Sequence, residues 1–270
     1  TVDGSLADLF LLQDRVAIEI EQVIESVHLG QNSSVSMSRE PAIAGGQSER
    51  ADSQRGTVSA APPSGPIDLT GLIDGPPAPI PPAVMRRDEQ GRTTVRAIKV
   101  DEGIRLDGVL DEAVYSSIPA ISDFIQQVPQ AGAPATERTE AWILFDEVNI
   151  YVSARVWDSA PESEWIANEM RRDTSQLRQN DTFTVFFDTF YDRRNGFNFY
   201  TNPLGARADQ QFTNEGNPNG DWNPVWDVRT GRFAGGWTVE MEIPFKTLRY
   251  RSGPAQVWGV QLRRAIRRKN

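Results

Sequence analysis

The 270-residue sequence contains no cysteine and only one histidine, His28. Without a thiol, the chain has no disulfide, no cysteine nucleophile and no cysteine-bound zinc or iron–sulfur site. Because His28 lies in the segment least able to join a packed site, neither a Ser-His-Asp triad nor a histidine-ligated metal site is expected. The groups left for chemistry or binding are carboxylates, amides, hydroxyls, guanidinium groups and indoles.

Long apolar runs and an excess of positive charge are also missing. No run approaches the roughly 18 apolar residues that a membrane-spanning helix needs. The formal net charge is -9, and residues 91–270 hold 24 acidic and 22 basic side chains. A nearly neutral domain offers no face that would neutralise a row of phosphates, so nucleic acid is not expected as a partner.

One local exception is a basic cluster at the end of the chain. It consists of Arg263, Arg264, Arg267, Arg268 and Lys269. Such a run usually lies on a solvated strand end. The alternative is a contact with a following segment or with an anionic membrane surface.

The first 92 residues differ in composition from the rest. From Ser5 to Leu29, apolar residues recur every three or four positions, which predicts an amphipathic helix within residues 1–30. Residues 31–92 are rich in Ser, Gly and Pro, and eight of the 18 prolines lie between Pro62 and Pro82. This composition predicts a disordered linker whose proline-rich part is extended.

From Thr93 onward, apolar and polar residues alternate, which is typical of strands. Strands are predicted at 93–100, 137–145, 149–157, 181–187, 197–201, 207–212, 225–230, 237–243 and 257–266. Only 111–116 and 164–172 have a short helical pattern. Many short strands without alternating helices predict that residues 93–270 form an all-β domain, an antiparallel β-sandwich.

Polar loops in this domain carry candidate sugar-binding residues. Trp222 and Trp226 lie in the loop at 214–227, and Trp165 lies beside Glu164. Indole faces stack on the C–H faces of pyranose rings, while Arg178, Arg207 and Asn223 would bind hydroxyl groups. The other tryptophans, at positions 142, 157, 237 and 258, lie within strand patterns and are assigned to packing.

The same loop carries alternating oxygen ligands around Gly220. Asn217, Asn219 and Asp221 have the donor type that calcium prefers, but no glutamate completes an EF-hand pattern. Calcium is therefore one interpretation of this loop. A turn held by Asn and Asp side chains is the other.

Pairs of carboxylates are the remaining candidates for chemistry. A glycosidase needs two of them at a fixed separation across a cleft. The sequence offers three pairs, namely Asp188 with Asp192, Asp221 with Asp227, and Glu240 with Glu242. Because Glu240 and Glu242 alternate with apolar residues, they are predicted to lie on the solvent face of a strand.

Several runs resemble a known family. Residues 104–115, IRLDGVLDEAVY, resemble the opening signature of carbohydrate-binding module family 9-like domains, as do the hairpin at 146–158 and the strand ending at Asp188. Further runs resemble the form of this domain found at the amino-terminal end of domain of unknown function 5916 outer-membrane proteins. They lie at 187–189, 192–197, 201–206, 221–227, 243–250 and 258–260.

This resemblance implies a function and a location. A family 9-like sandwich of this kind binds an oligo- or polysaccharide. The outer-membrane form implies export to the periplasm or outer membrane of a Gram-negative bacterium, with a β-barrel of the same polypeptide as a partner. Sugar-binding members carry a tryptophan where this chain has Arg178 and an acidic residue at about Thr184.

Three hypotheses follow for the function. The first is a non-catalytic carbohydrate-binding module of a cell-envelope protein. The second is a structural or interaction module that acts as a plug or lid of the barrel. The third, a glycoside hydrolase, depends on the carboxylate pairs alone.

Overall fold

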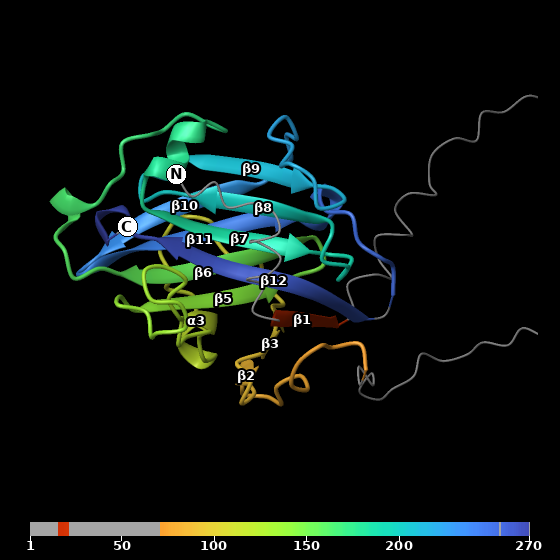
Figure 1. The fold of residues 1–270 in the computed structure, drawn as a ribbon. Helices are drawn as coiled ribbons and strands as arrows, with labels where there is room; N and C mark the ends of the chain where they lie inside the picture. The colour runs from red at the N-terminus through yellow and green to blue at the C-terminus, as the bar shows by residue number, and fades with distance from the viewer. Residues whose placement is uncertain (1–15, 22–70, 254, 270) are drawn as a thin grey trace, which may run out of the picture.

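The computed structural model describes residues 16–21, 71–253 and 255–269, and they form two β-sheets that lie face to face (Figure 1). The larger sheet has the order β2-β3-β1-β12-β7-β8-β9. Its strands, in that order, are Met85–Arg87, Thr93–Arg96, Val16–Glu21, Ala255–Ala265, Thr182–Asp188, Gly196–Thr201 and Arg207–Phe212. The second sheet consists of β10 Asp227–Phe233, β11 Gly236–Pro244, β6 Asn149–Trp157, β5 Thr139–Phe145 and β4 Ile98–Lys99.

In the residues that the structure describes, helical structure is limited to short segments. They are α3 Val114–Ser117 and the 3₁₀ turns η1 Glu162–Glu164, η2 Ser175–Gln179, η3 Phe245–Thr247 and η4 Arg267–Lys269. None of the helices in the described parts of the chain is long and apolar enough to cross a membrane. All strand pairs are antiparallel except β1–β3 and β4–β5. The predicted antiparallel β-sandwich is therefore confirmed.

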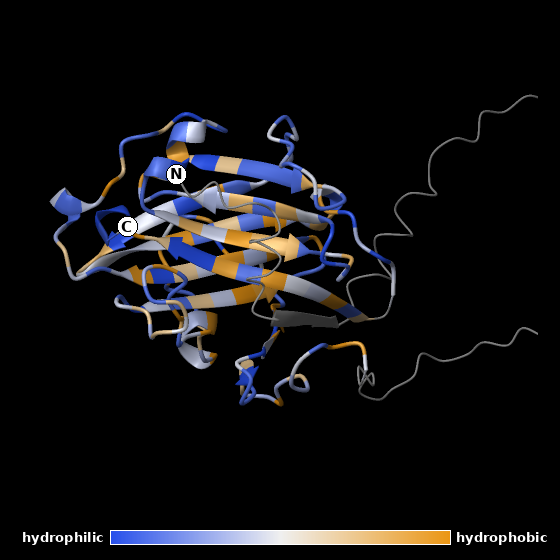
Figure 2. Ribbon diagram, in the orientation of Figure 1, coloured by the Kyte–Doolittle hydropathy of each residue, from blue (hydrophilic) through white to orange (hydrophobic). Residues whose placement is uncertain are grey.

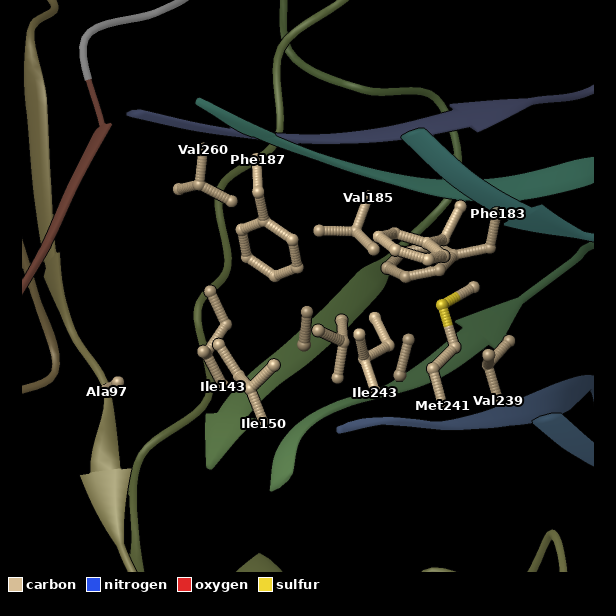
Figure 3. Close-up of a cluster of buried hydrophobic side chains, with 14 of the residues drawn as sticks. Ala97, Ile143, Ile150, Phe183, Val185, Phe187, Val239, Met241, Ile243 and Val260 are labelled. Carbon is tan, nitrogen blue, oxygen red and sulfur yellow. The ribbon is translucent and has the colours of Figure 1, made fainter. Parts of the chain in front are cut away.

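The core lies between the inner faces of the two sheets. Phe183, Val185 and Phe187 of β7 point toward Ile150, Met241 and Ile243 of the opposite sheet (Figure 3). Hydrophobic and hydrophilic residues alternate along the strands of the larger sheet (Figure 2). Full burial of each such side chain stabilises the fold by about 1.5–3 kcal/mol. The alternation therefore decides which face of each strand joins the core.

A second, smaller core covers the outer face of the five-stranded sheet. The segment at 104–115 crosses this face, and its Ile104, Leu110 and Tyr115 pack against Trp142 and Leu144. The ring of Tyr115 meets that of Trp142 edge to face at 5.4 Å. The signature that carries the family resemblance is thus a covering segment of the sandwich.

Glu240 lies beneath this covering segment, so the prediction that it faces solvent is wrong. Its side chain is 1% exposed. The carboxylate accepts hydrogen bonds from the backbone N–H groups of Asp107 at 3.1 Å and Gly108 at 2.6 Å, and from the Tyr115 hydroxyl at 3.3 Å. Burial raises the pKa of Glu240 to about 7 although these backbone bonds oppose the rise. Glu242 on the same face is partly buried.

The raised pKa of Glu240 predicts a dependence of stability on pH. The folded pKa of about 7 exceeds the ordinary glutamate pKa of 4.5, so the carboxyl favours the folded state below pH 4.5 and loses this contribution as the pH rises through 7. Glu240→Gln keeps an acceptor oxygen and does not titrate. Relative to Glu240→Gln, the free energy of unfolding of the wild-type chain should fall by about 3 kcal/mol as the pH rises from 4.5 to 7. Urea unfolding across that pH range measures the difference, and parallel pH profiles would contradict the prediction.

The structure changes the predicted organisation of the first 92 residues. Within the expected helix at 1–30, only Val16–Glu21 is described, and it is a strand paired with β12 and β3. The sequence VAIEIE also alternates with period two, and this pattern suits the sheet. The rest of the helix prediction and residues 31–70 of the linker lie outside the described residues.

Residues 71–92 are part of the domain, contrary to the linker prediction. The backbone N–H of Asp74 donates to the Tyr191 hydroxyl at 3.0 Å, and the Thr94 hydroxyl donates to the Pro76 carbonyl at 2.6 Å. Strand β2 pairs with β3. The helix predicted at 164–172 is also absent, because that segment has no regular secondary structure beyond η1. The prediction at 111–116 is confirmed in part by α3.

Candidate functional site

The outer face of the larger sheet carries a group of polar side chains. Because Phe183, Val185 and Phe187 point inward, Thr184 and Phe186 of β7 point outward. Across the strands, Arg263 pairs with Thr184, and Thr184 pairs with Tyr200. The next row contains Gln261, Phe186, Asn198 and Gln210. Together with Arg178, the polar members form what we call the outer-face cluster, namely Arg178, Thr184, Asn198, Tyr200, Gln210, Gln261 and Arg263.

The 3₁₀ turn η2 brings Arg178 to this cluster. Its Leu177 is fully buried and packs with Tyr200, Ala206 and Ala208. Arg178 follows directly and is exposed beside the Tyr200 hydroxyl. Burial raises the pKa of Tyr200, while the positive charge of Arg178 opposes that rise. The two positions singled out by the family resemblance, Arg178 and Thr184, therefore both lie next to Tyr200.

Asn198 contributes an unsatisfied acceptor to the same face. The residue is only 9% exposed. Its Nδ2 donates to Gln210 Oε1 at 3.4 Å, but its Oδ1 is buried and has no hydrogen-bond donor. A buried polar atom without a partner costs about 1–3 kcal/mol. A ligand that supplies an N–H or O–H group would remove this cost.

Trp226 and Arg207 lie elsewhere, at the edge of the sandwich. Trp226 is 3% exposed, its Nε1 donates to Asp209 Oδ2 at 2.8 Å, and its ring meets Phe199 at 5.2 Å. Arg207 donates to Asp227 Oδ1 at 3.1 Å. The prediction that Trp226 presents an exposed face is therefore wrong. The loop before it crosses between the edge strands β9 and β10, and the indole fills the gap between the sheets.

The other predicted sugar-binding residues are separate from Arg178. Trp222 is half-buried and stacks on Phe197 at 5.0 Å. Trp165 is half-buried, donates to the Ala160 carbonyl at 3.2 Å, and lies 5.4 Å from the guanidinium of Arg232. Asn223 is exposed in the β9–β10 loop. The predicted set is thus divided between the sandwich edge, the η1 region and the outer face.

The proposed calcium ligands form a turn. Asn217, Asn219 and Asp221 are exposed, and Asn219 Oδ1 accepts the backbone N–H of Asp221 at 3.1 Å. The Asn219 backbone also pairs with Gln211. No group of three or more Asp, Glu, His or Cys in the described residues is placed to hold a metal ion. The three side chains therefore fit a self-bonded turn better than a calcium cage.

Three members of the basic cluster at the end of the chain form an internal ion network and are not a solvated strand end, whereas Arg263 on β12 is exposed. Arg264 binds Asp158 at 3.0 Å, and Arg268 binds Glu137 at 3.1 Å. Lys269 also binds Glu137. Burial by itself would raise the pKa of Glu137, but the hydrogen bonds from these cations and Ser159 outweigh it and lower the pKa to about 2.

The carboxylate pairs are used in internal contacts. Asp188 is fully buried and accepts the backbone N–H groups of Asp192 at 3.1 Å and Arg193 at 2.6 Å. Asp192 in turn accepts the N–H of Asn195 at 2.9 Å. Asp227 pairs with Arg207 and Arg229. These contacts hold loops in place.

Comparisons with known proteins find similar solved structures and a matching family model. Two similar structures are family 9 carbohydrate-binding modules from Caldicellulosiruptor kristjanssonii. The module solved in complex with cellotriose is 15% identical to this chain and has a TM-score of 0.39. The match covers 55% of this chain and 66% of the module, which is just under two thirds of the module's length. The module solved in complex with glucose is 16% identical and has a TM-score of 0.43. That match covers 62% of this chain and 76% of the module.

A third similar structure is a putative carbohydrate-binding protein from Bacteroides uniformis. It is 12% identical, with a TM-score of 0.45 over 63% of this chain and 83% of that one. No curated protein matches the sequence. The family model for Carbohydrate family 9 binding domain-like proteins matches residues 106–265, which is more than half of the chain. The chain therefore belongs to the Carbohydrate family 9 binding domain-like family.

Proposed function

We propose that this domain is a non-catalytic carbohydrate-binding module and that its oligo- or polysaccharide ligand binds to the outer-face cluster. The observation that carries the proposal is Asn198 Oδ1, a buried acceptor without a donor. It lies on a sheet face that carries hydroxyl, amide and guanidinium groups beside Phe186. Sugar hydroxyl groups both donate and accept hydrogen bonds, so one ring satisfies several of these side chains. Family membership supports the same ligand class.

The contacts of the acidic residues favour binding over hydrolysis. A glycosidase requires one carboxyl that donates a proton and a second that faces the sugar across a cleft. Asp188 and Glu240 are enclosed by backbone N–H groups, and Asp227 is paired with two arginines. These contacts indicate that the three carboxylates stabilise the fold.

Isothermal titration against cello-, xylo-, galacto- and uronate oligosaccharides tests the proposal. Asn198→Ala and Arg178→Ala are each expected to weaken binding by about 3- to 10-fold, because each removes a hydrogen bond to the sugar. Asn223→Ala removes an exposed amide from the β9–β10 loop and serves as the matched control. Loss of binding in Trp222→Ala or Trp165→Ala, with the outer-face variants unaffected, would move the site to the loops. No heat with any oligosaccharide would end the proposal.

A second candidate is an interaction module that covers an outer-membrane barrel of the same polypeptide, exported to the periplasm or outer membrane. It is favoured by one observation: all seven tryptophans lie in the described residues, and each is buried or half-buried, so none forms an open stacking platform. Sedimentation of the domain with a separately produced barrel tests this candidate. Co-sedimentation supports it, and independent sedimentation contradicts it.

A further inference from the structure

Three guanidinium groups meet at the outer-face cluster without a neutralising carboxylate. Arg263 lies within electrostatic range of Arg267 and Arg178. An Arg267 Nη2 hydrogen donates to the backbone carbonyl of Arg178, and Arg267 Nε is buried without an acceptor. In the described parts of the chain, none of these three arginines forms an ion pair, whereas their neighbours Arg264 and Arg268 both do.

The local electrostatics show that this positive charge is uncompensated. Desolvation of its guanidinium lowers the pKa of Arg263, although the residue as a whole is exposed, and the charges of Arg267 and Arg178 lower it further. Asp173 and Asp209 lie within electrostatic range of Tyr200. Both are already bound by Arg172, each at 3.0 Å. The chain as a whole carries a net charge of -9, so this face is a local exception to its overall sign.

The side chains of the cluster require two properties in one ligand. Guanidinium groups bind carboxylates strongly through paired N–H donors. Asn198 Oδ1 accepts hydrogen bonds only, so it needs a ligand that carries O–H or N–H donors. A bare inorganic anion meets the first need, and a neutral sugar meets the second. A saccharide with a carboxylate on its ring meets both.

We propose that the outer-face cluster binds acidic saccharides, and that Arg178 and Arg263 hold the carboxylate of a uronic acid residue while Asn198 accepts a ring hydroxyl. This inference rests on the proposed carbohydrate-binding function and specifies its ligand class. Thr184 and Tyr200 follow Arg263 in the register of β12, β7 and β8, and Arg178 of η2 lies beside Tyr200. Their hydroxyl groups are placed to contact the same ring.

The test is isothermal titration of the whole chain with oligogalacturonate and with the neutral galacto-oligosaccharide of equal length. Other uronate oligosaccharides and other neutral oligosaccharides extend the acidic and the neutral ligand series. We expect the acidic ligand to bind at least about 10-fold more tightly, and to weaken as the ionic strength rises from about 0.05 to 0.5 M. Arg178→Gln and Arg263→Gln should each reduce this affinity by about 10-fold or more. They should weaken binding of the neutral sugar less, because glutamine keeps hydrogen-bond donors and removes only the charge.

Arg86→Gln is the matched control, since Arg86 is an exposed arginine on β2 of the same sheet. Asn198→Ala should weaken oligogalacturonate binding without changing any binding of dextran sulfate, which separates sugar recognition from general attraction to anions. Thermal unfolding of each variant confirms that it folds.

The outcomes separate this inference from the proposed function. If neutral oligosaccharides bind as tightly as uronates and Arg263→Gln does not change the affinity, the proposal of an acidic ligand is overturned. The proposed carbohydrate-binding function is then unaffected. Equal losses in Arg86→Gln and Arg263→Gln would show general attraction to anions and would also overturn the proposal of an acidic ligand. Absence of binding to every oligosaccharide would overturn both.

Discussion

Replacing Gly231 with alanine is expected to lower the free energy of unfolding by about 3 kcal/mol or more. A Cβ atom at this position would lie 2.1 Å from the carbonyl oxygen of Gly108 and 2.7 Å from the Thr238 hydroxyl. The first of these atoms is backbone, so no rotamer change relieves the overlap. The covering segment at 104–115 would have to move off the five-stranded sheet.

The same contact constrains Gly108 from the other side. Its φ of +85° is one that residues with a Cβ rarely adopt, and a Cβ there would lie 2.8 Å from the backbone carbon of Thr230. Urea unfolding of Gly231→Ala measures the effect. Gly220→Ala is the control, because a Cβ at Gly220 would meet no atom within 4 Å. Equal stability of the two variants would show that the covering segment does not pack as described.

Removing Asp158 is expected to cost about 3–5 kcal/mol, because it leaves a buried cation without its partner. Asp158 and Arg264 have side chains that are 3% and 8% exposed, and they form an ion pair at 3.0 Å. Burial lowers the pKa of Arg264 to about 10, while the acidic neighbours of the network oppose this shift. In Asp158→Ala, the main opposing charge is gone and the desolvation of Arg264 is no longer offset.

Thermal and urea unfolding of Asp158→Ala measure this loss. The control is Asp111→Ala, which breaks an ion pair with Arg105 whose two side chains are 64% and 60% exposed. Such a surface pair contributes at most about 1 kcal/mol. A loss in Asp158→Ala no larger than in the control would mean that the ion network at the chain end contributes little to stability.

Local pattern was sufficient to predict most of the strands. In NIYVSARVW of β6, every second residue from Ile150 to Val156 is apolar, and these residues face the core as expected. The same alternation separates Phe197 and Phe199 from Asn198 and Tyr200 in β8, so it carried a signal for two members of the outer-face cluster. That signal does not by itself mark a binding site, because one face of an antiparallel sheet commonly carries polar residues.

Glu240 and Trp226 were misplaced for a shared reason. Alternation in β11 correctly puts Glu240 on the face opposite the core, but a segment more than 120 residues earlier covers that face. Trp226 lies in a polar loop, yet the loop closes the gap between two edge strands and buries it. Exposure of a side chain depends on what the rest of the chain places over it, and neighbouring residues do not carry that information.

The sequence by itself determined the all-β class, most strand positions and the family, because these depend on the spacing of apolar residues and on short motifs. Only the tertiary structure decided that residues 16–21 and 71–92 join the domain, that the basic end binds buried carboxylates, and that Arg178 lies close to Tyr200 and Arg263. Those facts depend on pairing between segments far apart in the chain. The free energy of such pairing depends on contacts between distant segments, and these contacts produce no periodic pattern in the local sequence.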